Sequence, residues 1–167
     1  MRFNIFSTPI WIEDIDSSKL ELITEEYGRR WLSDTLSSYG SNNNKMTEKG
    51  MRYLKEQIIN CLQDFKIFDC TIPSVWRNVY NNNDFQETHM HPNSSFSFVI
   101  YEKLQEPHTV FFHPSRMMIF STKVDKYVDS IFFPQVKQNQ MIIFPSYLEH
   151  MVKKTNNAIT ISGNIDV

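Results

Sequence analysis

Two histidines one residue apart, His89 and His91, are the residues whose types and spacing most clearly indicate chemistry. Side chains at positions i and i+2 of a β-strand point to the same face, so these two imidazoles could bind one metal ion. His150, in a separate segment much further along the chain, could supply a third ligand. Three protein ligands leave coordination positions open for substrate, as in catalytic rather than structural metal sites. Spacing alone also allows another interpretation, in which two strand histidines are merely hydrogen-bonded and the third lies in an exposed loop.

The segments that would position these histidines change in character after Pro73. From there the sequence consists of short runs rich in β-branched and aromatic residues, separated by turn residues. Many short strands at this spacing are typical of a sandwich or barrel. We expect strands at residues 76–80, 87–91, 95–103, 109–112, 117–121, 130–133, 140–144 and 158–165.

The N-terminal part predicts a different layer. Residues 3–15 favour one or two strands at a sheet edge, because Pro9 interrupts them. Capping-box spacing at Ser18 and apolar residues at helical period up to Trp31 predict a first helix. Thr47 is a candidate N-cap for a second helix, with an apolar stripe that extends to Phe65. The predicted fold is therefore mainly β with N-terminal helices, in a single domain whose residues 1–72 pack on a β-sandwich at 73–167.

The last predicted strand has two different faces. Its isoleucines fall on one face, and the other face carries Ala158, Thr160, Ser162 and Asn164. A strand with one apolar face and one small, polar face could line a pocket between two sheets. The pattern is equally compatible with a polar face that meets water.

Composition narrows the functional class. The chain has 167 residues, a formal net charge of −2 and a pI of about 6.2. A duplex nucleic-acid binder is usually basic, so we do not expect that partner. No apolar run reaches the ~18 residues of a membrane helix, and the N-terminus lacks the apolar segment of a signal peptide. With two cysteines outside any C-x-x-C pattern, this favours an intracellular, cytoplasmic protein, and an exposed edge at residues 3–10 would permit an oligomer.

Several blocks of this sequence resemble a family of small 2-oxoglutarate/Fe(II)-dependent oxygenases found in bacteria and in tailed phages, marine ones especially. The first block runs from Trp76 through His89-Met90-His91-Pro92 to Tyr101. The second is residues 141–152, with Phe144-Pro145-Ser146 before His150, and residues 159–165 are similar to the family's final strand. The resemblance covers essentially the whole chain in order.

The resemblance implies a double-stranded β-helix, the jelly roll shared with cupins, with Fe(II) at its open mouth. It implies His89, His91 and His150 as metal ligands and no catalytic residue beyond them. His91 stands where most 2-oxoglutarate oxygenases have a carboxylate, so the site would be one charge more positive. The implied reaction oxidises an unidentified substrate, as a hydroxylase does, while 2-oxoglutarate becomes succinate and CO2, in the host cytoplasm if the gene belongs to a phage. The cosubstrate-binding residues would be Asn78, Tyr101, Arg116, Thr160, Ser162 and Asn164.

Ala158 is a departure from the family pattern. The family's last strand opens with an arginine that binds the distal carboxylate of 2-oxoglutarate, and a bidentate arginine–carboxylate pair is a strong, geometry-specific interaction. Candidate substitutes are Arg116, Arg77, Lys153 and Lys154.

Two alternatives to this oxygenase are a cupin-like three-histidine metal enzyme that does not use 2-oxoglutarate and a non-catalytic binding module on the same fold. Ala158 and His91 favour the first of these, whereas the sequence blocks favour the oxygenase.

Overall fold

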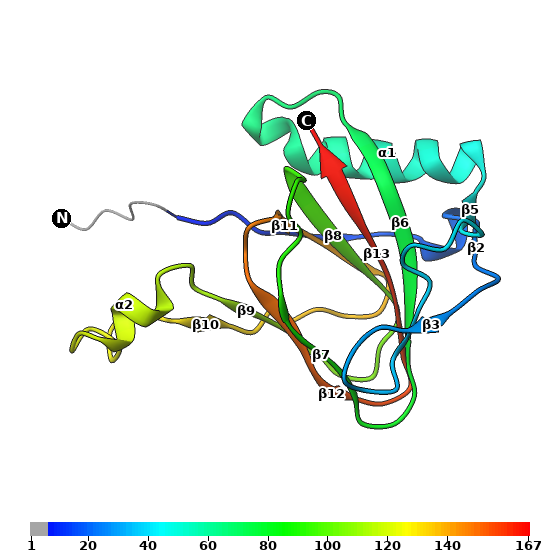
Figure 1. Cartoon of the computed structure of the whole chain (residues 1–167). Helices are drawn as coiled ribbons and strands as arrows, with labels where there is room; N and C mark the ends of the chain where they lie inside the picture. The colour runs from blue at the N-terminus through cyan, green and yellow to red at the C-terminus, as the bar shows by residue number, and fades with distance from the viewer. Residues whose placement is uncertain (1–6) are drawn as a thin grey trace.

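A computed structural model describes residues 7–167 of the chain (Figure 1). A seven-stranded antiparallel sheet has the order β1-β11-β8-β13-β6-β4-β3, and a four-stranded sheet has the order β10-β9-β12-β7. The strands are β1 (Trp11–Asp14), β2 (Leu22–Ile23), β3 (Gly28–Arg29), β4 (Leu36–Ser37), β5 (Lys45–Met46), β6 (Thr71–Tyr80), β7 (Asp84–His89), β8 (Phe96–Lys103), β9 (Thr109–Phe112), β10 (Ile131–Phe132), β11 (Gln140–Pro145), β12 (His150–Thr155) and β13 (Ala158–Asp166). The helices are α1 (Glu48–Leu62), α2 (Arg116–Phe120) and the 3₁₀ turns Ser17–Lys19 and Gln63–Phe65. The arrangement is a jelly roll, as the resemblance implies.

Alternation along the central strands creates two separate cores. On β13, Ile161 and Ile165 pack toward helix α1, with alternate residues of β8 and β11. The intervening residues of β8 and β11, such as Val99 and Phe144, pack between the two sheets. Because strand side chains alternate between faces, α1 covers the outer face of the large sheet and leaves its inner face to the second sheet (Figure 1).

Helix α1 forms where the sequence predicts the second helix. The Thr47 hydroxyl accepts a hydrogen bond from the Gly50 N–H at 3.0 Å, so Thr47 is the N-cap. Leu54, Ile58 and Leu62 are fully buried on the face toward the sheet. Burying an aliphatic side chain of this size contributes about 1.5–3 kcal/mol, so this face anchors the helix.

The predicted first helix is wrong. After a 3₁₀ turn capped by Asp16, the chain runs as short strands, β2 against β5 and β3 against β4. Leu20 of the expected stripe is fully buried, but Ile23 and Tyr27 are exposed. The apolar period therefore arises from separate contacts of an extended segment rather than from one helix face.

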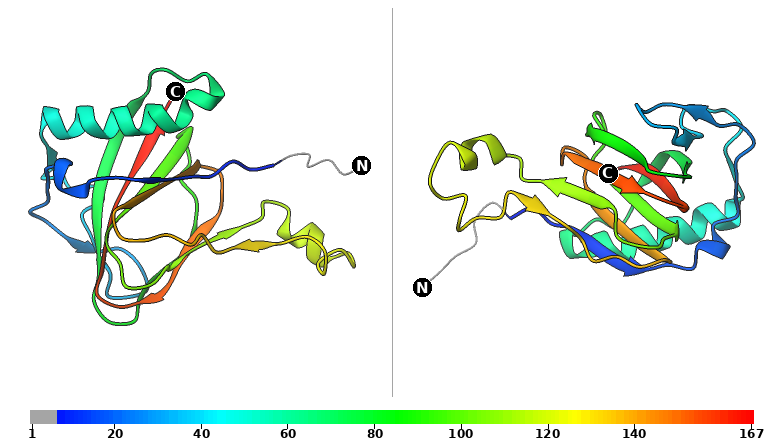
Figure 2. Two further views of the ribbon diagram at one scale, coloured as in Figure 1. Left: turned by 180° about the vertical axis from the view of Figure 1, so that it is seen from behind. Right: turned by 90° about the horizontal axis from the view of Figure 1, so that it is seen from below.

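Two further differences from the predicted strands concern helix α2, between β9 and β10, and strand β12. Residues 117–121, predicted as a strand, belong largely to helix α2, where Met117 and Met118 are more than two-thirds exposed. Helix α2 lies in an arm, with β9 and β10, that extends away from the body (Figure 2). The sequence does not predict strand β12, because its run of polar and charged residues gives no strong strand signal.

The N-terminal strand prediction is partly testable. Strand β1 lies at the edge of the large sheet, inside the predicted range 3–15, whereas residues 1–6 lie outside the described part. Within residues 7–167, no helix has the length and apolarity needed to cross a membrane.

Candidate metal centre and cavity

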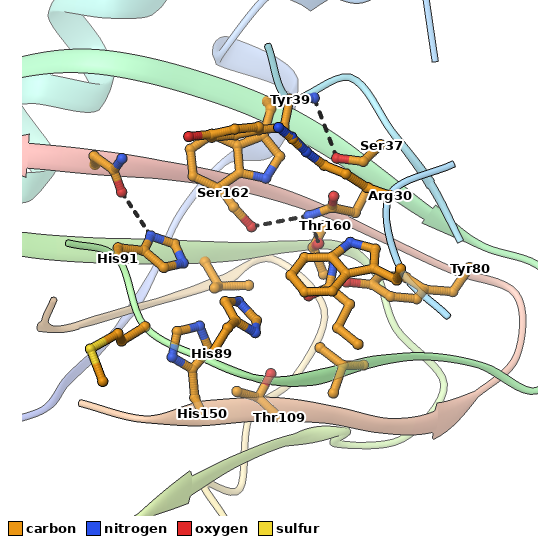
Figure 3. Close-up of a pocket in the computed structure, with 18 of the residues that line it drawn as sticks. Arg30, Ser37, Tyr39, Tyr80, His89, His91, Thr109, His150, Thr160 and Ser162 are labelled. Atoms are coloured by element: carbon orange, nitrogen blue, oxygen red, sulfur yellow. Dashed lines mark hydrogen bonds between the residues drawn. The ribbon is translucent and has the colours of Figure 1, made fainter. Parts of the chain in front are cut away.

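Three histidine side chains meet between the two sheets. His89 ends β7 and pairs with His150, which begins β12. His91 follows β7, and its backbone N–H donates to the Ser146 carbonyl at 3.0 Å. The candidate ligand nitrogens of the three rings all lie within 4.8 Å of one another, and the rings converge at one end of a cavity (Figure 3). The structure therefore brings together the three histidines singled out from the sequence.

Hydrogen bonds set which nitrogen of each ring is free. His89 and His150 each contact the backbone carbonyl two residues earlier through Nδ1, at 2.7 and 3.0 Å. His91 Nδ1 contacts the side-chain oxygen of Asn164 at 2.7 Å. All three acceptors require Nδ1 to carry the proton, so each Nε2 keeps its lone pair. Fixing the tautomer through the second ring nitrogen is how proteins prepare histidine for metal binding.

Burial keeps these imidazoles neutral. It lowers the pKa of His89 to about 4 and also lowers the pKa of His91. The pKa of His150 lies well below its usual value, first because of burial and then because of the neighbouring His89. Neutral imidazole is the form that binds metal, so metal ions meet little competition from protons here at neutral pH.

The donor set fits a transition metal with open positions. Three neutral nitrogens suit Fe(II), Zn(II), Ni(II) or Cu(II), and three ligands leave the remaining positions to other molecules. The common iron site of this type has two histidines and one carboxylate, but His91 supplies a neutral donor instead. The ligand set therefore offsets none of the metal's charge, which favours an anionic partner.

A cavity of about 540 Å³ extends from the triad. This volume falls within the roughly 300–1,000 Å³ that is typical of small-molecule sites. Its large-sheet wall includes Asn78 on β6 and Thr160 and Ser162 on β13. Figure 3 shows the three histidines at one end and Tyr80 at the other.

Four of the predicted cosubstrate residues line this cavity: Asn78, Thr160, Ser162 and Asn164. The Asn78 amide nitrogen donates long hydrogen bonds of 3.4 Å to the hydroxyls of Thr160 and Ser162. Its amide oxygen is buried and has no partner within the described residues. The polar face of β13 therefore meets the cavity rather than bulk water.

The other two predicted residues, Tyr101 and Arg116, are not among the lining residues. Tyr101 is fully buried in the core between the sheets, and its hydroxyl donates to the Thr109 hydroxyl at 2.7 Å. Arg116 lies on α2 in the arm, where its guanidinium pairs with Glu149 at 3.2 Å and stacks on Phe112. Both side chains are thus engaged elsewhere.

The remaining substitutes for the family arginine do not line the cavity either. Arg77 points away from it and forms a bidentate pair with Glu102, at 2.8 and 3.0 Å. Lys153 and Lys154 lie on β12, also outside the lining. Among the described residues, Arg30 is the single lysine or arginine that lines the cavity.

Arg30 follows Arg29 in a short basic pair, a pattern that is typical of a solvated surface. In the structure its guanidinium lies 4.1 Å from the ring centre of Tyr39, and Trp31 next to it packs against His89 at 4.6 Å between ring centres. These residues come from the segment whose pattern wrongly predicts a helix. No local sequence signal marks them, because only the pairing of β3 and β4 with the large sheet brings them to the site.

His108 has the sequence context of a turn residue. It is instead fully buried and lines the cavity. Neither of its ring nitrogens has a hydrogen-bond partner among the described residues. Its position just after Pro107 is typical of an exposed turn, so no local pattern indicates that it lies inside.

Comparison with protein families gives one match: a sequence model of the 2OG-Fe(II) oxygenases matches residues 74–164, more than half of the chain. This span includes all three histidines and every residue predicted to bind the cosubstrate. Comparison with curated proteins found no match to this sequence.

Solved structures with a similar fold include the α-ketoglutarate-dependent epimerase SnoN from nogalamycin biosynthesis, with a TM-score of 0.65 and 8% identity over 95% of this chain and 78% of that one. HygX from Streptomyces hygroscopicus, with nickel, 2-oxoglutarate and hygromycin B bound, has a TM-score of 0.54 and is 10% identical. The alignment covers 95% of this chain and 83% of HygX. A 2OG-Fe(II) oxygenase-family oxidoreductase from Burkholderia pseudomallei has a TM-score of 0.53 and is 12% identical. The alignment covers 94% of this chain but 66% of that longer one. At these identities the similarity shows the fold alone.

Proposed function

The chain belongs to the 2OG-Fe(II) oxygenase family, whose cofactors are Fe(II) and 2-oxoglutarate, and we propose that it is a dioxygenase of the hydroxylase type. It would oxidise its substrate while 2-oxoglutarate is converted to succinate and CO2. The observation that best supports this is the cluster of three largely buried, neutral imidazoles with free Nε2 atoms at one end of a large cavity. A structural metal site would be closed by a fourth protein ligand.

The protein's own residues prepare the site. His89, His91 and His150 would hold Fe(II), which supplies the oxidising chemistry together with O2 and the cosubstrate. Asn164 orients His91, and the two backbone carbonyls orient the other rings. The protein's contribution is orientation and a cavity shielded from water.

Asn78, Thr160 and Ser162 would contact the cosubstrate. They lie side by side on β6 and β13, between the triad and the far end of the cavity. The unpaired Asn78 amide oxygen and the two weakly bonded hydroxyls leave donors and acceptors free for a ligand. Arg116 and Tyr101 are not part of this proposal, because other side chains occupy their polar groups.

The substrate would enter past an aromatic rim. Trp31, Tyr39 and Trp76 line the cavity beside Arg30, and Met90 next to the triad is about half exposed. Aromatic rings with one guanidinium suit a planar or partly apolar molecule better than a duplex nucleic acid, whose phosphates require many cations. The rim therefore favours a small molecule or a single side chain as substrate.

The decisive experiment is anaerobic titration of the metal-free protein with Fe(II) and then with 2-oxoglutarate. We expect the weak visible charge-transfer band of the chelated cosubstrate, and its loss in His89→Ala and His91→Ala. His113→Ala, at an exposed turn histidine outside the lining, is the matched control and should keep the band. Succinate formation in air would then establish turnover.

The three-histidine enzyme without 2-oxoglutarate is the second candidate, because Ala158 provides no cation at the start of β13. It predicts iron binding without the charge-transfer band. Absence of iron binding would instead support the non-catalytic module.

A further inference from the structure

The far end of the cavity poses an electrostatic problem for the proposed cosubstrate. 2-Oxoglutarate chelates a metal through one carboxylate and its keto oxygen, so its second carboxylate must lie away from the triad. Burying a carboxylate without a partner is strongly unfavourable. Ala158, at that end of β13, is buried in a small apolar cluster with Tyr80 and Val152. Arg30, the one arginine among the described lining residues, is exposed at the rim.

His108 is the side chain that lacks a partner in this region. It is fully buried, it lines the cavity, and both of its ring nitrogens are without a hydrogen bond among the described residues. Buried polar groups are almost always paired, so a buried imidazole with two unpaired nitrogens indicates that something else completes it. A ligand in the cavity can do so.

The position of His108 matches the length of the cosubstrate. Its ring centre lies 5.5 Å from that of Tyr80, whose backbone pairs with Ala158. Strand pairing places Phe111 opposite His150, and His108 is three residues before Phe111. At ~3.3 Å per residue this puts His108 about 10 Å along the strand from the triad. An extended five-carbon dicarboxylate, with a bond to the metal at one end and a hydrogen bond to the imidazole at the other, spans roughly this distance.

We propose that His108 binds the distal carboxylate of 2-oxoglutarate and takes up a proton from solvent when the cosubstrate binds. The resulting imidazolium supplies, from the residue just before β9, the positive charge that Ala158 does not supply from β13. Tyr80, which lines the cavity beside it, is placed to contact the same carboxylate. This inference rests on the proposed function, because it names the residue that recognises the cosubstrate.

The surroundings of His108 fit a proton that arrives with the ligand. Burial lowers the pKa of His108 to about 4, so the ring is neutral at pH 7 before the cosubstrate binds. The titratable groups that face it are Tyr80 on β6, Tyr101 on β8 and Lys153 on β12. The Glu106 backbone carbonyl raises the pKa of His108, which partly opposes the effect of burial. It does not form a hydrogen bond of normal geometry with the ring.

A carboxylate brought next to the ring raises the pKa of His108. The pKa of this imidazole is then higher in the complex than in the free protein. Between the two pKa values, affinity for the carboxylate falls up to tenfold per unit rise in pH. Binding of 2-oxoglutarate is therefore expected to depend on pH in a range where the free protein does not titrate at His108.

The test uses the Ni(II)-loaded protein and isothermal titration with two ligands. 2-Oxoglutarate is compared with 2-oxobutanoate, which keeps the chelating groups but lacks the distal carboxylate. Between pH 6 and 8, 2-oxoglutarate should lose affinity as the pH rises. Titrations in buffers of different ionisation enthalpy should show about one proton taken up per 2-oxoglutarate bound. 2-Oxobutanoate should show neither effect.

Variants of His108 test whether this residue takes up the proton when 2-oxoglutarate binds. His108→Asn should weaken 2-oxoglutarate about 10- to 100-fold, the range of a charge-assisted hydrogen bond, and abolish proton uptake. The double variant His108→Asn/Ala158→Arg should restore affinity without restoring proton uptake. His113→Asn, at the exposed turn histidine, is the matched control and should behave as the wild type.

The outcomes separate this inference from the proposed function. Wild-type binding of 2-oxoglutarate without proton uptake, or with unchanged affinity in His108→Asn, would overturn the role of His108 and leave the oxygenase intact. Loss of affinity in Arg30→Ala but not in His108→Asn would place the carboxylate at the rim and also overturn it. If the protein binds Ni(II) but neither oxo acid, the proposed function itself fails.

Discussion

Asn164 is the residue that most clearly links the last strand to the candidate metal centre. Its side-chain oxygen holds His91 at 2.7 Å, and the Ser97 hydroxyl donates to the same oxygen at 3.4 Å. His91 is the proposed ligand that stands where most enzymes of this family have a carboxylate, and it does not belong to a strand. Its orientation therefore depends on this contact more than the other two rings depend on theirs.

Replacing Asn164 by Ala should weaken Ni(II) or Fe(II) binding about 10- to 100-fold, the usual effect of removing the hydrogen-bond partner of a metal ligand. Asn164→Asp keeps an acceptor oxygen and should retain most of the affinity. Titration calorimetry with Ni(II) measures both. Asn82→Ala, in an exposed turn, is the matched control. Equal metal affinity in Asn164→Ala and wild type would show that His91 needs no such support.

The residues that could be predicted from the sequence are those whose role follows from local spacing. The polar face of β13 could be identified because strand periodicity places side chains without knowledge of the fold. His89 and His91 could be identified from their i, i+2 spacing, although β7 ends at His89 and His91 lies just after the strand. His150 could be named as a possible third ligand from the sequence, although its strand, β12, has a weak signal. Arg30 and His108 could not be identified, because long-range pairing alone brings them to the cavity.

At the level of elements, a close backbone contact with helix α1 explains why the segment that begins at the 3₁₀ turn Ser17–Lys19 does not continue as the predicted first helix. Gly50 of α1 lies directly against the backbone of Leu20, so close that a Cβ added at Gly50 would be 2.0 Å from the Leu20 carbonyl oxygen. The 3₁₀ turn Ser17–Lys19 and the buried Leu20 thus pack tightly on the start of α1. Tertiary packing of this kind overrides a helical apolar period.

Gly50→Ala is a sharp test of that contact. Helix propensity alone would make alanine more stable by about 1 kcal/mol. The clash with Leu20 should reverse the sign and lower the free energy of unfolding by roughly 1–3 kcal/mol, as overpacking does. Gly28→Ala, where the added Cβ would have no atom of residues 7–167 within 4 Å apart from its chain neighbours, should change stability by less than about 0.5 kcal/mol. Urea unfolding measures both, and a Gly50→Ala protein at least as stable as wild type would contradict the packing.

At the scale of the whole molecule, the fold holds four neutral imidazoles in one cavity between the two sheets. His89, His91, His108 and His150 all line the cavity between the two sheets. Burial is the first cause of the lowered pKa of each. The large sheet, backed by α1, and the smaller sheet together exclude the water that would otherwise stabilise the charged rings (Figure 1). Protons therefore compete both with metal binding and with folding.

The stability of the metal-free protein should consequently decrease as pH falls. Each ring is neutral in the folded state, whereas in the unfolded state it is protonated below a pKa of about 6.5. The unfolded chain then binds more protons, so the free energy of unfolding drops between pH 6.5 and about 4. For the fully buried His108, whose pKa falls from 6.5 to about 4, the loss reaches about 3 kcal/mol.

Thermal unfolding of the metal-free protein at steps from pH 7.5 to 4.5 measures this slope. His108→Phe keeps a buried ring without a titratable group, so its unfolding temperature should fall less steeply with acid than that of the wild type. His113→Asn, at an exposed histidine, should follow the wild-type slope. If His108→Phe and wild type lose stability in parallel, His108 is not held neutral by the fold. In that case, the proton uptake expected with 2-oxoglutarate would have no buried imidazole to receive it.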